Sequence, residues 1–441
     1  MYNISIYWYD FFLAFIFAIT SVGLLKIFYK PEKKVSNVFF RALYFKYFFS
    51  SLFCIIIVFV YGGIGDSISF FAESLLARDE VASGQLGFFE YLKFTESDFM
   101  DRQWYNHGAP SGAFLEKISF ILSYPGCKSF LLTSLLFAFV AFFGVWKLYI
   151  TTVKIFPDKA KILGLGILFF PSVCFYSSGI FKDTVSFSAL GWFVFALYEL
   201  STKSSKNVKN WIICSLSLYI IYIVRSYVFY SIVLSLVFMI YERMLNSRKL
   251  VKMKLFLNFS FIVLVISLFY SFYSFIEQEL LADFISEIAS NKVLYDSVGG
   301  GSNYNIISGE SFALSDLIKT LPISIFTTLF RPFLWESNSA LMIISSLENT
   351  ILFIYFISTL FKKGIVNFRY NMKNDILLPF FLMYVIAFSG LVSIYTSNFG
   401  TLIRYRISAM PLLIFIIVSI QLKKNETLKI NKNETLKINI N

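Results

Sequence analysis

Six charged residues stand at the ends of long apolar runs. An ionised side chain in such a place costs free energy, so each of these residues is a candidate for a functional role. They are Asp66, Lys182, Asp183, Arg225, Arg404 and Arg406. A carboxylate in such a place can take a proton from a hydroxyl group. Lys can bind a phosphate as a point charge, and Arg can bind one through two parallel hydrogen bonds. The residue types therefore predict a phosphate-bearing substrate with a general base beside it.

Asp66 is the candidate general base. It lies in YGGIGDSISFF, directly after an apolar run. Gly62, Gly63 and Gly65 let the chain turn sharply and let the backbone approach a ligand closely. The alternative is structural, because Asp followed by Ser is also a good N-cap for the helix predicted to follow.

Lys182 and Asp183 occupy a turn between two short apolar runs, in FPSVCFYSSGIFKDTVSF. Adjacent residues do not face each other on a helix, so each is expected to have its own partner. We expect Lys182 and Asp183 to contact the substrate. The alternative is a charged turn in which Asp183 caps the next helix.

The arginines are candidate phosphate ligands. Arg225 interrupts IIYIVRSYVFY, where it could equally extend toward water from the end of a span. Arg404 and Arg406 open the last apolar run, LIRYRISAMPLL, on the side expected to be outside. Two arginines there run against the usual charge bias. We therefore expect an anionic partner, either a lipid phosphate or a carboxylate from an outer loop.

Two loop residues complete the predicted substrate-binding set. His107, the only histidine, lies in DRQWYNHGAPSG, and Arg331 lies in RPFLWES, where it could instead pair with Glu336. One histidine excludes a multi-His metal site. The four cysteines show no metal-ligand spacing, so free thiols are expected. They are Cys54, Cys127, Cys174 and Cys214.

The composition predicts a membrane protein. The 441 residues are 57% hydrophobic and 15% charged, against about 45–50% and about 25% in soluble domains. A net charge of +12 invites a nucleic-acid partner. However, the basic residues fall in clusters between apolar runs, as the positive-inside rule expects. We predict a lipid bilayer as the surroundings and no nucleic-acid partner.

The apolar runs predict an all-α bundle of about eleven transmembrane helices, because one span needs about 17–25 apolar residues. The runs lie near 5–28, 43–61, 129–150, 162–177, 185–201, 210–224, 227–242, 255–276, 346–361, 376–396 and 405–422. The breaks SSGIFKDT and RSY each predict a helix pair that turns at the membrane surface. One long kinked helix is the alternative at RSY.

The basic residues orient the bundle. With the N-terminus outside and the C-terminus in the cytoplasm, the cytoplasmic segments hold 27 of the 39 Lys and Arg residues. These segments are 26–46, 147–161, 203–209, 243–254, 362–373 and 423–437. The much longer outer loops hold the remainder, as the positive-inside rule requires.

Two outer loops are long, 62–128 and 277–345, and loops of this length are usually functional. The first contains SISFFAESLLARDE, which predicts an amphipathic helix on the membrane surface. The second contains LPISIFTTLFRPFLW, which we interpret as interfacial or re-entrant. We expect the two loops to pack together over the span ends. Residues 1–422 are thus predicted to form one transmembrane domain, followed by a disordered basic tail, 423–441, in which KNETLKIN occurs twice.

The layout resembles the GT-C class of membrane glycosyltransferases. The likeness rests on Asp66 in GIGDS and on the segments FPSVCFYSSGIFKDTVSF and RYRISAMPLL. The resemblance implies a bacterial cytoplasmic (inner) membrane enzyme of cell-surface glycan synthesis. It implies a polyprenyl-phosphate-linked sugar donor and a glycan or lipid acceptor. Asp66 would be the base, and Lys182, Arg225 and Arg404 would hold the donor phosphate.

Two alternatives stay open. An O-antigen or exopolysaccharide polymerase would show similar basic outer loops. A flippase or transporter of lipid-linked oligosaccharides would show internal repeats and charges in mid-span, and neither is evident here. Many GT-C members carry a paired acidic motif, whereas Asp66 stands without an acidic neighbour nearer than Glu73. A divalent metal cofactor is therefore left open.

Overall fold

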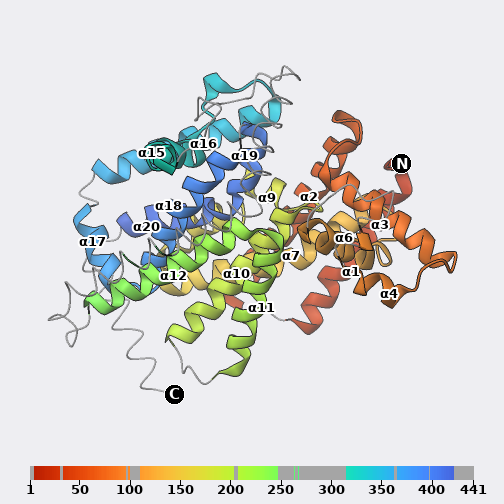
Figure 1. Cartoon of the computed structure of the whole chain (residues 1–441), viewed down its shortest axis with the longest axis horizontal. Helices are drawn as coiled ribbons and strands as arrows, with labels where there is room; N and C mark the ends of the chain where they lie inside the picture. Colours follow the sequence, from red (N-terminus) through yellow and green to blue (C-terminus); the bar gives the residue numbers. More distant parts are fainter. Residues whose placement is uncertain are drawn as a thin grey trace. The chain divides into compact units, whose positions relative to one another are not determined.

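The computed structural model describes residues 4–29, 33–95, 98–99, 110–202, 207–246, 314–361, 365–396 and 398–421, with positions 263 and 267. Every element within these ranges is a helix (Figure 1). The chain divides into two compact units. The first holds residues 1–151 and 164–226, and the second holds 152–163 and 227–441.

Six helical stretches among the described residues are long and apolar enough to cross a membrane. They are α1 (Trp8–Phe28), Val35–Val60 of α2 (Lys33–Ile55) and η1 (Ile56–Val60), α7 (Phe130–Ile155), α10 (Lys182–Thr202), α12 (Ser226–Asn246) and Met342–Thr359 of α16 (Ala340–Thr359). Two bent helix pairs raise the number to as many as eight. The chain therefore has the helices of a multi-pass membrane protein.

The bent pairs correspond to the last two predicted spans. Asn367–Asn374 of α17 (Ile365–Asn374) meets α18 (Leu378–Tyr395) at 108°. Phe399–Ser408, which comprises α19 (Phe399–Tyr405) and η7 (Arg406–Ser408), meets α20 (Met410–Gln421) at 62°. Pro379 lies in the first turn of α18, where a proline is tolerated because its missing N–H is not needed.

The expectation of eleven spans is not confirmed. The run 162–177 is divided into α8 (Ala160–Ile167) and α9 (Pro171–Tyr176), because Pro171 disfavours the helical conformation at the residue before it. The run 210–224 forms α11 (Val208–Val224), which is apolar but only 17 residues long. Apart from positions 263 and 267, the run 255–276 lies outside the described ranges, as does the tail 423–441.

Three short helices of the first unit form a cluster after α2. They are α3 (Asp66–Ala82), α4 (Phe88–Lys93) and α6 (Pro110–Ser123), and α3 packs along α6. Their core comprises Ala77, Leu86, Tyr91, Phe99, Ala113 and Phe120. SISFFAESLLARDE is thus helical as predicted. Its position on a membrane surface stays a prediction.

The spans of the first unit pack tightly. α10 lies against α11 (Figure 1). α7 and α10 approach through Gly144 and Gly191, since a Cβ at Gly191 would stand 2.0 Å from the Gly144 carbonyl oxygen. Small residues at such crossings allow two membrane helices to pack backbone against backbone.

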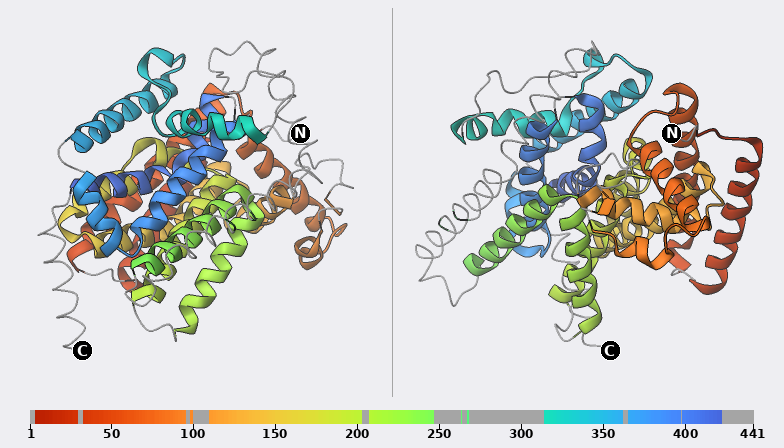
Figure 2. Two further views of the ribbon diagram at one scale, coloured as in Figure 1. Left: turned by 60° about the vertical axis from the view of Figure 1, so that its left-hand side comes forward. Right: turned by 45° about the vertical axis from the view of Figure 1, so that its right-hand side comes forward.

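In the second unit, α15 (Leu314–Phe330) packs against α18, and α18 packs against α20 (Figure 2). LPISIFTTLFRPFLW therefore contributes most of a helix that contains Pro322, followed by η5 (Leu334–Glu336). α20 is buried from Met410 to Ile420 and forms the core of this unit. The predicted contact between the two long loops, and the single domain over 1–422, stay predictions.

Candidate functional site

The beginning of α10 gathers side chains from three helices of the first unit. Lys182 Nζ donates a hydrogen bond to Ser111 Oγ of α6, at 2.8 Å. The same ammonium group lies 5.8 Å from the centroid of the Phe70 ring of α3. Lys182 also stands in the first turn of a 21-residue helix, whose N-terminus carries partial positive charge. This end of α10 is therefore suited to an anion.

Asp66 lies near this point. It is the first residue of α3 and is exposed, and the N-cap position belongs to Gly65, whose φ of 134° favours glycine. The alternative that Asp66 is the N-cap is therefore wrong. Phe70 follows Asp66 by four residues, and side chains with that spacing are neighbours on one helix face. Lys182 therefore lies over a ring that is one helical turn along α3 from Asp66.

Asp183 and Arg225 form a nearly buried ion pair. Arg225 Nη2 donates to Asp183 Oδ2 at 2.9 Å, and the two side chains are 11% and 3% exposed respectively. Arg225 has φ −150° and ψ 86°, so it ends α11 and interrupts the helix at the RSY break. The prediction that Lys182 and Asp183 have separate partners is confirmed.

Lys46 is a residue that the sequence reasoning missed as a site candidate. It was counted with the cytoplasmic basic residues, but it lies eleven residues inside the span Val35–Val60, about 16 Å along the helix. Its ammonium group donates to the carbonyl oxygen and the hydroxyl oxygen of Ser177, each at 2.5 Å. Ser50 Oγ donates to the Ser178 carbonyl oxygen at 2.9 Å. α2 thus fixes the chain that leads into Lys182.

A buried acid group lies in the cluster of α3, α4 and α6. Glu73 and Glu116 are 3% and 0% exposed, and the Tyr91 hydroxyl donates to Glu116 Oε1 at 2.6 Å. Burial raises the pKa of Glu116 well above its ordinary value, the Tyr91 hydrogen bond lowers it, and Glu73 raises it again. The sequence contained a sign that Glu73 is buried. Glu73 falls between Phe70 and Ala77 at the three- and four-residue spacings of an apolar helix face.

The arginines of the second unit take different roles. Arg406 is 1% exposed, and its Nη1 donates to the carbonyl oxygens of Thr328 and Arg331, at 3.3 and 2.7 Å. Its Nη2 donates to Asn349 Oδ1 at 2.6 Å. These contacts give Arg406 a structural role at the end of α15, and its contact with substrate stays a prediction.

Arg331 pairs with Glu336 through Nε at 2.8 Å and also through Nη2. The local pairing that the sequence left open is therefore confirmed. Arg404 stands beside Tyr405, with its Cζ atom 5.1 Å from the ring centroid. Its donor-binding role stays a prediction. His107 lies outside the described residues.

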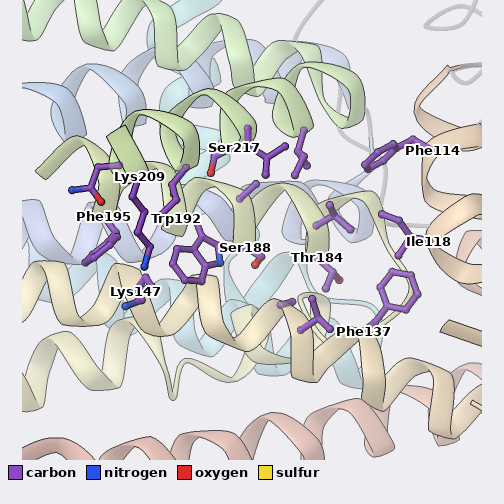
Figure 3. Close-up of a pocket in the computed structure, with 18 of the residues that line it drawn as sticks. Phe114, Ile118, Phe137, Lys147, Thr184, Ser188, Trp192, Phe195, Lys209 and Ser217 are labelled. Atoms are coloured by element: carbon purple, nitrogen blue, oxygen red, sulfur yellow. The ribbon is translucent and has the colours of Figure 1, made fainter. Parts of the chain in front are cut away.

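A groove of about 710 Å³ runs between α6, α7, α10 and α11 of the first unit (Figure 3). Most of its lining consists of apolar and small side chains, among them Ala141, Val185, Ala189 and Ile213. Phe114, Ile118 and Thr184 lie at one end, whereas Lys147 and Lys209 lie at the other. The volume falls within the usual range of roughly 300–1,000 Å³ for small-molecule sites.

Of the predicted residues in the first unit, the structure brings Asp183 and Arg225 into contact and places Lys182 over Phe70, one turn of α3 after Asp66. None of these four lines the groove, although Thr184 does. Within the described ranges, no three His, Cys, Asp or Glu side chains gather as a metal site would require. No protein-family model matches the chain, and neither does any curated protein or solved structure.

Proposed function

We propose that this chain is a membrane glycosyltransferase that takes a sugar from a polyprenyl-phosphate-linked donor at the outer face of a bacterial cytoplasmic membrane. The observation that carries the proposal is the contact of Lys182, at the start of α10, with Phe70, which follows Asp66 by one turn of α3. The exposed Asp66 carboxylate and the Lys182 ammonium group would supply the two functions that such a reaction needs.

In the proposed reaction, Asp66 takes the proton of the acceptor hydroxyl as its oxygen attacks the anomeric carbon of the donor sugar. The bond from that carbon to the phosphate oxygen breaks, and the electron pair leaves with the polyprenyl phosphate. Lys182 and the N-terminus of α10 stabilise the negative charge that grows on this leaving group. Lys182 already donates to Ser111, which holds the ammonium group in place.

Asp183 and Arg225 hold the charged turn rather than react. Within the first unit, Lys182 and Arg225 balance Asp66 and Asp183, so these four groups sum to zero at neutral pH. A phosphate would then be held because the Lys182 N–H groups and the N-terminus of α10 point toward it, and not because the site carries a net positive charge. This makes the position of the Lys182 ammonium group decisive for donor binding.

The test is a transfer assay with purified protein and a panel of polyprenyl-phosphate sugars, with and without added divalent metal. Asp66→Asn should abolish transfer while donor binding persists, and Lys182→Gln should weaken donor binding. Asp79→Asn is the matched control, since Asp79 lies on the same helix and pairs with the exposed Lys128 at 2.7 Å. Normal transfer by Asp66→Asn would refute the mechanism. Joining of preassembled repeat units in the same assay would favour a polymerase.

A further inference from the structure

We propose that the groove between α7, α10 and α11 is a binding site for one anionic phospholipid. The acyl chains would lie along α10, and the phosphate would lie between Lys147 and Lys209. This site is independent of the proposed transfer reaction, because the groove includes neither Asp66 nor Lys182.

The shape of the groove suits a lipid chain. α7 and α10 pack closely at Gly144 and Gly191, and the small residues Ala141, Ser188 and Ala189 of the same two helices line the groove. From Thr184 to Phe195 the groove follows α10 for about 16 Å. One leaflet of a bilayer has a hydrocarbon thickness of about 15 Å, half of the core. The outer face of α11 exposes Ile212, Leu216 and Tyr219, as expected of a helix that borders lipid.

The charged end of the groove suits an anionic headgroup. Figure 3 shows the Lys147 and Lys209 side chains at the same end, with Trp192 and Phe195 beside them. Lys147 Nζ lies 4.4 Å from the centroid of the Phe195 ring and 5.4 Å from that of Trp192. These rings hold the ammonium group at the mouth of the groove. Lys209 is exposed and extends from the first turn of α11, whose N-terminus also favours an anion.

The charges at this end favour an anionic lipid over a zwitterionic one. The ionisable residues that line the groove are Lys147, Lys209 and the buried Glu199, which sum to one positive charge when all are ionised. A lipid with one net negative charge neutralises this surplus, whereas a zwitterionic lipid leaves it in place. Asn207 and Asn210 add amide groups that can donate hydrogen bonds to phosphate oxygens. The charge bias of the sequence places this end at the cytoplasmic leaflet, where anionic lipids attract basic side chains.

The test uses the purified full chain in detergent, with phosphatidylglycerol and phosphatidylcholine of identical acyl chains, read by native mass spectrometry. We expect one phosphatidylglycerol to bind in preference. The double variant Lys147→Gln/Lys209→Gln should weaken its binding roughly thirtyfold, five- to sixfold for each lysine. The control is Lys159→Gln/Lys161→Gln, which removes the same charge outside the groove and should bind normally. Equal binding of both lipids, or no effect of the double variant, would overturn the proposal.

A third variant tests the apolar part of the groove separately from the two lysines at its charged end. Ser217→Trp keeps both lysines but fills the groove, so it should lose the lipid as well. Unchanged binding in this variant would mean that the lipid is held only at the surface, which also overturns the proposal. Tighter binding of a polyprenyl phosphate than of phosphatidylglycerol, with the same lysine dependence, would reassign the groove to the donor and contradict the assignment to a phospholipid.

Discussion

Arg225 and Asp183 form an ion pair with an N–O distance of 2.9 Å between the end of α11 and the start of α10, and little of either side chain reaches solvent. The two residues are 42 positions apart in the chain. Removing one partner of a buried pair leaves a charge without compensation and costs about 3–5 kcal/mol, whereas apolar replacement of both is often neutral.

Asp183→Asn should therefore lower the free energy of unfolding by about 3 kcal/mol, while Asp183→Leu/Arg225→Met should come close to the parent protein. Thermal unfolding in detergent measures both variants. If the double variant is as unstable as Asp183→Asn, the pair contributes to stability by more than the mutual compensation of its two charges.

The Lys46 side chain should hold the segment from α9 to α10 in place. Lys46→Met leaves the Ser177 carbonyl oxygen without its donor. We expect the nearby Cys174, whose thiol is buried, to react with a maleimide roughly tenfold faster, since an unmade buried hydrogen bond costs about 1–3 kcal/mol. Peptide mass spectrometry measures the rate at each cysteine, and the exposed Cys127 is the internal reference. The matched control is Lys93→Met, on an exposed side chain. Unchanged protection of Cys174 in Lys46→Met would contradict the anchoring role.

The helix cluster around Glu116 should be more stable at acidic pH. Burial raises the pKa of Glu116 in the folded state above the ordinary value of 4.5. A raised carboxyl pKa gives stability that is fully present below the unfolded-state pKa and is lost as pH rises toward the folded-state pKa. Glu116→Gln should remove this dependence and increase protection at pH 8. Hydrogen exchange of residues 66–123 at pH 5 and pH 8 measures the effect, with Glu80→Gln as the control. Greater protection at pH 8 in the parent protein would refute the prediction.

The two arginines of RYR should respond differently to the same change. Arg406→Lys should lower the free energy of unfolding by about 3 kcal/mol, because a single ammonium nitrogen cannot reach all the acceptors that the guanidinium contacts through two separate nitrogens, namely two carbonyl oxygens and Asn349 Oδ1. Arg404→Lys should change it by less than about 1 kcal/mol and should weaken donor binding instead. Chemical denaturation and donor titration separate the two effects. Similar losses of stability in both variants would remove the distinction.

The orientation can be tested with reporter fusions after residues 30, 100, 206 and 310. The clustering of basic residues predicts inside, outside, inside and outside in that order. An inside report at 100 or 310 would reverse the orientation and with it the proposed outer-face chemistry.

Local patterns in the sequence were sufficient to predict a multi-pass membrane protein and most of its helices. Apolar runs of sufficient length are a local property, so α1, α2, α7, α10, α12 and α16 could be predicted from composition alone. The interruption at Arg225 was also local, because it follows from a charged residue within an apolar run.

The partners of the charged residues could not be predicted in the same way, because they depend on contacts between distant parts of the chain. Arg406 and Arg404 are two positions apart and equally basic, yet Arg406 is buried against carbonyl oxygens that lie about 75 residues away in the chain. Lys46 was counted as a cytoplasmic charge, but its partner Ser177 is 131 residues away. Glu73 and Glu116 are buried together in one cluster of helices, although they come from separate segments of the sequence. Hydropathy measures the cost of burying a charge, whereas the partner that offsets this cost comes from packing between distant segments.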